Sequence, residues 1–106
     1  MDARTAHDSL DQVLFVDVRE NYEYKGGHIS GSRHIPFGEI PERVEDLEGA
    51  GRVVTVCKSG SRSDEAARYL RAFGVDAENL DGGVIAWTQE GFDLVAPDGS
   101  AGRVVM

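Results

Sequence analysis

The sequence has a single cysteine, no long apolar run and no cluster of basic residues. One cysteine in 106 residues excludes an internal disulfide framework and a multi-cysteine metal site. The three histidines, His7, His28 and His34, lack the paired spacing of zinc ligands, so we expect no metal. No apolar run approaches the roughly 20 residues that span a bilayer, and the first ten residues lack the features of a secretory signal. We therefore expect a cytoplasmic chain with no membrane partner.

Positive charge is scarce as well. Nineteen acidic residues against 11 basic ones give a formal net charge of −8. Binding nucleic acid takes a clustered basic surface, so we expect no nucleic-acid partner. The acidity indicates either a solvated surface or an acidic face for a basic partner. The length and the 41% apolar content predict one globular domain.

Apolar patterns predict an α/β fold. Four short apolar or extended stretches predict strands: residues 14–18, 34–35, 53–56 and 79–80. Between them lie patterns typical of helices: a turn that Gly26-Gly27 ends, residues 39–47, residues 63–73, and a stretch after Gly82-Gly83. This alternation predicts a small parallel sheet with helices on both faces. After Val95 we expect a frayed end rather than an edge element.

The lone cysteine stands where such folds place ligands, at the carboxyl end of a strand and before a helix. Residues 58–61 can curl so that their backbone N–H groups form an anion-binding nest, and Gly60 permits the positive φ this needs. We expect Ser61 or Ser63 to cap the helix that follows. Lys58 and Arg62 add positive charge. The pattern predicts a lowered pKa for Cys57 and indicates a sulfur nucleophile rather than a structural cysteine.

Three segments carry a family resemblance. "CKSGSRS", from Cys57, resembles the active-site loop of the single-domain rhodanese-like sulfurtransferases, with four residues between cysteine and arginine. "FVDVRENYEYKGGHISGSRHIP" and "LDGGVIAW" resemble the N-terminal and C-terminal motifs of that family, in the right order. The resemblance implies a rhodanese-like three-layer fold. It covers about residues 13–94, which we take as the core of a single domain, 1–106, with a short tail at 95–106.

The resemblance also implies a reaction. Cys57 would take a sulfane sulfur from a small anionic donor such as thiosulfate and hold it as a persulfide. A thiophilic acceptor, such as cyanide or a thiol, would then remove it in a ping-pong scheme. No cofactor or metal is implied. The residues expected to bind the donor are Lys58, Ser59, Gly60, Ser61 and Arg62.

Four other residues are expected to support this site. In the family, residues at the positions of Asp17 and Arg19 mainly brace the fold. Arg62 either faces the donor or turns inward to pair with Asp17 or Glu23, and we favour the second arrangement. Ser63 is expected to support the loop from the start of the helix.

Several alternatives stay open from the sequence. Lys58 either selects an anionic donor or faces solvent, and His28 fits a glycine turn better than a general base. Cysteine-dependent phosphatases and arsenate reductases carry five residues between cysteine and arginine, and the latter also use a second thiol. A persulfide carrier that delivers sulfur to a partner protein would use the same chemistry at Cys57. The sequence does not distinguish a monomer from a homodimer.

Overall fold

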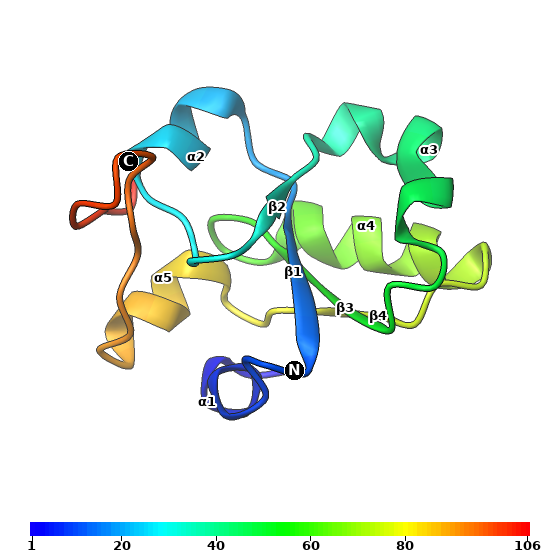
Figure 1. The fold of residues 1–106 in the computed structure, drawn as a ribbon, viewed down its shortest axis with the longest axis horizontal. Helices are drawn as coiled ribbons and strands as arrows, with labels where there is room; N and C mark the ends of the chain where they lie inside the picture. Colours follow the sequence, from blue (N-terminus) through cyan, green and yellow to red (C-terminus); the bar gives the residue numbers. More distant parts are fainter.

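The computed structural model describes all 106 residues and has a four-stranded parallel sheet at its centre (Figure 1). The strand order is β2-β1-β3-β4, and neighbouring strands run parallel. Their bounds are β1 (Val13–Asp17), β2 (Arg33–His34), β3 (Arg52–Val56) and β4 (Ala77–Asn79). The predicted parallel α/β sheet is confirmed.

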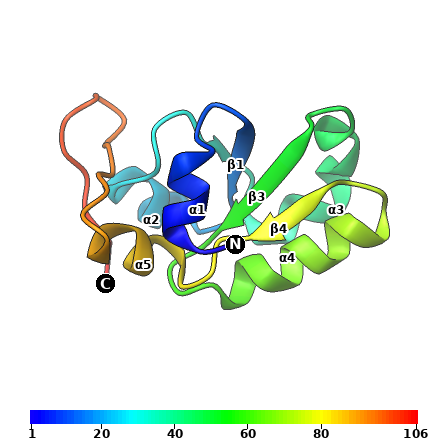
Figure 2. The ribbon, with the colours of Figure 1, turned by 90° about the horizontal axis from the view of Figure 1, so that it is seen from below.

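Helices cover both faces of this sheet. Helices α1 (Ala3–Asp8) and α5 (Gly83–Gln89) lie on one side, and α3 (Ile40–Arg43) and α4 (Ser61–Ala72) lie on the other (Figure 2). Successive strand residues point to opposite faces, so Val16 packs against the α3 and α4 side and Phe15 against the α1 and α5 side. Both faces are buried, which explains why the central strands are almost continuously apolar. None of the helices combines the length and the apolar composition that a membrane span needs.

The segment predicted as one helix over residues 39–47 is divided into three. A 3-10 turn, η1 (Phe37–Glu39), leads into α3, and a second 3-10 turn, η2 (Val44–Leu47), follows it. Pro41 lies in the first turn of α3, where its missing N–H leaves no hydrogen bond unmade. The backbone dihedrals leave the α-helical region at Arg43 (φ −115°, ψ 9°), and the next four residues form a 3-10 turn, which is wound more tightly than an α-helix.

Helix α1 was not predicted from the sequence. It has only six residues, and its buried face consists of Ala3 and Ala6, which form a weak apolar pattern. Asp2 caps it by accepting a hydrogen bond from the N–H of Thr5 at 2.8 Å. The helix is held in place by packing against α5.

The prediction of a frayed C-terminal end is wrong. Val95 forms bridges with His28 and Ala101, and the N–H of Arg103 donates to the carbonyl of Gly26 at 2.9 Å. The end of the chain therefore lies beside α2 (Asn21–Gly26), as Figure 1 shows. A Cβ atom at Gly27 would come within 2.4 Å of the nitrogen of Arg103, so the glycine pair permits this close approach.

Candidate active site

The loop that carries Cys57 connects the end of β3 to the start of α4. Helix α4 begins at Ser61, two residues earlier than predicted, and its N-cap is Gly60 rather than Ser61 or Ser63. Gly60 adopts φ 106°, a conformation that other residues rarely adopt. A Cβ atom there would also lie 3.2 Å from the nitrogen of Gly82. The sharp turn at Gly60 folds the loop back over the sulfur atom.

Neutral hydrogen-bond donors surround the sulfur of Cys57. Its Sγ accepts from the N–H of Gly60 at 3.1 Å, from the N–H of Ser63 at 3.4 Å and from the hydroxyl of Ser63 at 3.2 Å. Burial raises the pKa of Cys57, but the Ser63 hydroxyl and the N–H groups of Ser63, Gly60 and Ser59 outweigh it and bring the pKa below its ordinary value. The direction agrees with the prediction from the sequence.

The N-terminus of α5 sets the orientation of this loop. The carbonyl of Cys57 accepts from the N–H of Val84 at 2.9 Å, and the carbonyl of Lys58 accepts from the N–H of Ile85 at 3.1 Å. Because C=O and N–H point in opposite directions in a trans peptide, holding the Lys58 carbonyl toward α5 turns the N–H of Ser59 toward the sulfur.

Gly83 makes this contact possible. A Cβ atom at Gly83 would lie 2.3 Å from the carbonyl oxygen of Cys57, closer than real Cβ atoms come to any neighbour. Gly82-Gly83 was expected only to form a turn, so this contact was not predicted from the sequence. The glycine pair at the start of the helix was the signal that could have predicted this contact. The first N–H groups of a helix have no partner within it, and glycine lets the carbonyls of another segment come close enough to accept from them.

Arg62 pairs with Glu23 on α2. Two nearly parallel hydrogen bonds, of 2.9 and 3.0 Å, join its guanidinium to the carboxylate. The Glu23 side chain is 7% exposed and the Arg62 side chain is 36% exposed. The hydrogen bond from Arg62 lowers the pKa of Glu23, against the opposing effect of burial. Of the arrangements considered for Arg62, the structure has the inward pair with Glu23.

Asp17 and Arg19 form a second, fully buried ion pair at the end of β1. The closest contact, from Arg19 Nη2 to Asp17 Oδ2, is 2.8 Å, and the same nitrogen donates to the carbonyl of Gly27 at 2.7 Å. These bonds tie the segment after α2 to the central sheet. Because the carboxylate of Asp17 already binds the guanidinium of Arg19, it does not pair with Arg62.

His28 lies in an aromatic stack next to Gly27, whose carbonyl Arg19 binds. Its ring stacks on Tyr24 with centroids 4.0 Å apart, and His34 stacks on the same ring at 4.4 Å. The Nδ1 atom of His28 is 3.0 Å from the carbonyl oxygen of Tyr24. The ring is held by α2, as expected for a residue of a turn.

The mouth of the loop is polar, but the sulfur itself is enclosed. Ser59 and Ser61 are exposed and Lys58 is half-buried without an ion pair, whereas Cys57 is 0% exposed. None of the cavities in the protein is lined by Cys57. In this conformation the loop and its neighbours therefore enclose the sulfur.

Asn79, at the end of β4, is a further residue that the sequence analysis missed. The hydroxyl of Ser63 is 2.5 Å from Asn79 Oδ1 as well as 3.2 Å from the sulfur of Cys57, and it carries a single hydrogen. The Nδ2 group of Asn79 donates to Asp81 Oδ1 at 3.3 Å, which fixes the orientation of the amide. Asn79 and Cys57 therefore compete for one hydrogen bond.

A rhodanese-like domain profile matches residues 2–90 of this chain. The chain belongs to the rhodanese-like domain family. It is 39% identical over 90 residues to a sulfurtransferase of Allochromatium vinosum, with 84% of each protein covered. Two solved structures are also similar. A rhodanese-related protein from Thermoplasma volcanium has a TM-score of 0.86 at 29% identity, covering 90% of this chain and 95% of that one. A rhodanese-like domain protein from Staphylococcus aureus has a TM-score of 0.81 at 32% identity, covering 91% and 95%.

In this rhodanese-like domain, the three segments that carry the resemblance meet at one end of the sheet. The first supplies the buried Asp17–Arg19 pair and Glu23, and the second supplies the loop around Cys57. The third supplies the N-terminus of α5, which holds the loop from the other side. The expected rhodanese-like fold is therefore confirmed.

Proposed function

We propose that this rhodanese-like domain is a sulfurtransferase that moves a sulfane sulfur from thiosulfate to a thiophilic acceptor through a persulfide on Cys57. The observation that carries the proposal is the ring of neutral donors around a buried Sγ atom. These donors suit an anionic sulfur that must stay reactive, because they stabilise its charge without neutralising it. Relatives named thiosulfate sulfurtransferase GlpE support the donor, among them one from Pseudomonas paraeruginosa that is 38% identical over 86 residues.

The proposed first step loads the cysteine. The Cys57 thiolate attacks the outer sulfur of thiosulfate, a new S–S bond forms, and the S–S bond of thiosulfate breaks. Sulfite leaves with the electron pair of that bond. The persulfide carries its negative charge on the outer sulfur, where the N–H groups of the loop can stabilise it. The attacking species is the thiolate, which the lowered pKa of Cys57 favours, so the proposed step is written without a general base or a cofactor.

The proposed second step unloads it. Cyanide, or a thiolate acceptor, attacks the outer sulfur of the persulfide and forms a bond to it. The S–S bond to Cys57 breaks, its electron pair returns to Sγ, and thiocyanate or a new persulfide leaves. Lys58 would assist the first step, since its ammonium attracts an anionic donor toward Ser59, Gly60, Ser61 and Arg62.

A persulfide carrier is the second candidate function. A Bacillus subtilis protein provisionally named a sulfur carrier, YrkF, is 38% identical over 82 residues, and this chain spans 44% of its length. The enclosed sulfur of Cys57 supports this candidate, since contact with a partner protein could open the loop. Phosphatase and arsenate reductase activities fit less well, because the loop has four residues between Cys57 and Arg62 and the chain has no second thiol.

The test is thiocyanate formation from thiosulfate and cyanide by the protein and by Cys57→Ser. An intact-mass measurement after thiosulfate alone accompanies it, and the single cysteine makes any added sulfur unambiguous. Turnover and one added sulfur atom, both absent from Cys57→Ser, are expected. Loading without turnover would favour the carrier. The absence of both loading and turnover would overturn thiosulfate as the donor.

A further inference from the structure

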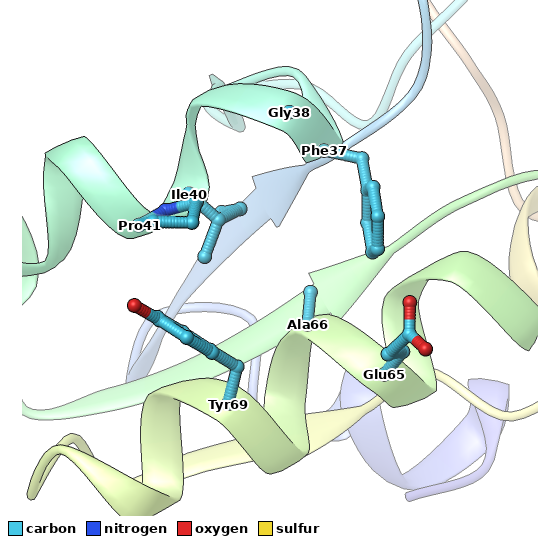
Figure 3. A pocket seen from close by; sticks show the side chains of 7 residues that line it. All are labelled: Phe37, Gly38, Ile40, Pro41, Glu65, Ala66 and Tyr69. Carbon is cyan, nitrogen blue, oxygen red and sulfur yellow. The ribbon is translucent and has the colours of Figure 1, made fainter.

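Two adjoining cavities form a groove between the α3–η2 segment and α4. The first, of about 400 Å³, lies between Phe37, Ile40 and Pro41 on one side and Ala66 and Tyr69 on the other (Figure 3). The second, of about 340 Å³, shares Pro41 and Tyr69 with the first and continues along η2 and α4. Together they make one continuous α3–α4 groove.

The floor of the groove is apolar and partly aromatic. Figure 3 shows the side chains of Phe37 and Ile40 directed toward α4, with the Tyr69 ring facing them from that helix. The ring of Phe73 lies 4.8 Å from that of Tyr69 and lines the second cavity. Phe73 is 58% exposed, although large apolar side chains are normally buried. Aromatic side chains of this kind are enriched at protein–protein interfaces.

The rim of the groove carries carboxylates that form no ion pair. Four carboxylates that line the two cavities form no ion pair: Glu42, Glu45, Glu48 and Glu65. The other acidic residues of these helices and turns are each paired with an arginine, namely Glu39, Asp46 and Asp64. An apolar floor with an unpaired acidic rim is complementary to apolar side chains flanked by lysine or arginine.

The groove begins close to the active-site loop. Glu65 follows Arg62 by three positions on α4, which is one helical turn. On the opposite wall, the N–H of Phe37 donates to the carbonyl of Val18 at 2.9 Å, directly after the end of β1. A protein seated in the groove would therefore extend to the end of the sheet where Cys57 lies.

We propose that the α3–α4 groove is the docking site for a partner protein that exchanges sulfur with Cys57, and that this partner binds through a segment of apolar side chains flanked by lysine or arginine. The inference rests on the proposed function of Cys57 for its sulfur-transfer part. The acidic rim repels nucleic acid and anionic lipid, so charge selects a basic protein segment over these ligands. The same rim repels a second copy of this chain, whose net charge is −8.

The docking test uses two synthetic peptides with the same apolar stripe and one terminal cysteine, one flanked by lysine and arginine and the other by glutamate. The basic peptide is expected to bind the full chain and to shift the NMR resonances of Tyr69, Phe73 and Glu65. Raising the salt concentration should weaken this binding. Equal binding of the acidic peptide, or shifts confined to other surfaces, would overturn the proposal.

Two double variants distinguish the effect of the groove glutamates on peptide binding from the effect of the overall net charge. Glu45→Lys with Glu48→Lys should weaken binding of the basic peptide at least tenfold. Asp8→Lys with Asp11→Lys makes the same change in net charge at two exposed residues that form no ion pair and lie outside the groove, and should leave binding within about twofold. Equal losses for the two pairs would show non-specific attraction and overturn the groove. A wild-type dimer in sedimentation that Glu45→Lys with Glu48→Lys abolishes would identify a second copy as the occupant instead.

The link to sulfur transfer is tested with the same peptides as acceptors. The peptide thiolate attacks the outer sulfur of the Cys57 persulfide, and the Cys57 thiolate leaves. Transfer to the basic peptide should be at least tenfold faster than to the acidic one, and Glu45→Lys with Glu48→Lys should remove the advantage. Thiosulfate–cyanide turnover should stay within twofold in that variant. Turnover with equal transfer to both peptides would overturn docking alone, whereas peptide binding without persulfide formation would overturn the proposed function alone.

Discussion

Two supports hold the active-site loop, and they differ in chemistry. On one side the N-terminus of α5 binds the carbonyls of Cys57 and Lys58 through neutral backbone hydrogen bonds. On the other side α2 binds Arg62 through the carboxylate of Glu23. The backbone support fixes the direction of the Ser59 N–H, whereas the ionic support holds the first turn of α4, which carries Ser63, against α2. The two supports should therefore fail in different ways.

The difference has consequences for how each support responds to solution conditions. Backbone hydrogen bonds do not titrate, so the α5 support should be insensitive to pH and salt. The Glu23–Arg62 pair is partly exposed through Arg62, so salt screens it and acid removes it. The orientation of the Ser59 N–H thus depends on the support that is independent of pH, whereas Ser63 lies in the turn of α4 that the ion pair holds against α2.

The largest effect is expected from Gly83→Ala. The added Cβ atom would lie 2.3 Å from the carbonyl oxygen of Cys57, so the loop must move away from α5. Losing oriented donors at a reacting anion typically costs about 100-fold or more in rate, and sulfur loading from thiosulfate should fall by roughly that factor. Intact-mass kinetics of persulfide formation measure it.

Gly74→Ala is the matched control for this change. Gly74 also has a positive φ, 88°, but an added Cβ atom there meets nothing within 4 Å. Its variant should lose roughly 1 kcal/mol of stability from backbone strain and keep wild-type loading. Equal loss of loading in both variants would show that strain, and not the contact with Cys57, explains the effect of Gly83→Ala.

A smaller effect on the sulfur is expected from Ser63→Ala. The Ser63 hydroxyl is the strongest of the donors that lower the pKa of Cys57, so its removal should raise that pKa toward the ordinary value. A hydrogen bond to a charged group contributes about 1.5 kcal/mol or more, so alkylation at neutral pH should slow roughly tenfold. The pH profile of alkylation provides the measurement, and Ser61→Ala, an exposed serine on the same helix, should leave the profile unchanged.

The ionic support is tested by Glu23→Gln. Because the folded pKa of Glu23 lies below its ordinary value, the carboxylate adds stability above the unfolded pKa, and this stability is lost as pH falls through the folded pKa. Urea unfolding should show a wild-type advantage of about 1 kcal/mol at pH 7, a value that allows for screening at Arg62. The advantage should vanish in strong acid and shrink in high salt. Glu48→Gln, at an exposed glutamate with no ion pair, should show no such advantage at any pH.

The contrast between the supports also explains what the sequence could predict. The strand, cysteine loop and helix are consecutive in the chain, so local pattern was sufficient to place Cys57 at a strand end before a helix start. The direction of the Cys57 pKa shift was predicted for the same reason. The helix boundary was misplaced because its cap is the backbone turn at Gly60 and not a serine side chain.

Contacts between distant segments were the part that local pattern could not resolve. Arg62 had two acidic candidates, and the choice of Glu23 depends on Asp17 already being bound by Arg19. The glycines at 26–27 and 82–83 were read as turns, whereas their close contacts with the C-terminal tail and with the Cys57 loop arise only in three dimensions. The local sequence pattern predicts that a glycine lies in a turn, but it does not predict which distant atom packs against that glycine.

The smallest expected effect is the change in the pKa of Cys57 in Asn79→Ala. Its sign shows whether Asn79 acts through the Ser63 hydroxyl or has a purely structural role. Removing its side-chain oxygen leaves the Ser63 hydroxyl with Cys57 as its remaining acceptor, so Asn79→Ala should lower the pKa of Cys57 further, opposite in sign to Ser63→Ala. The double variant should match Ser63→Ala, because Asn79 would act through that hydroxyl and lose its effect when the hydroxyl is absent. Alkylation profiles of the three variants test this. An upward shift in Asn79→Ala, or additive shifts in the double variant, would mean that Asn79 supports the loop by another route, such as its hydrogen bond to Asp81.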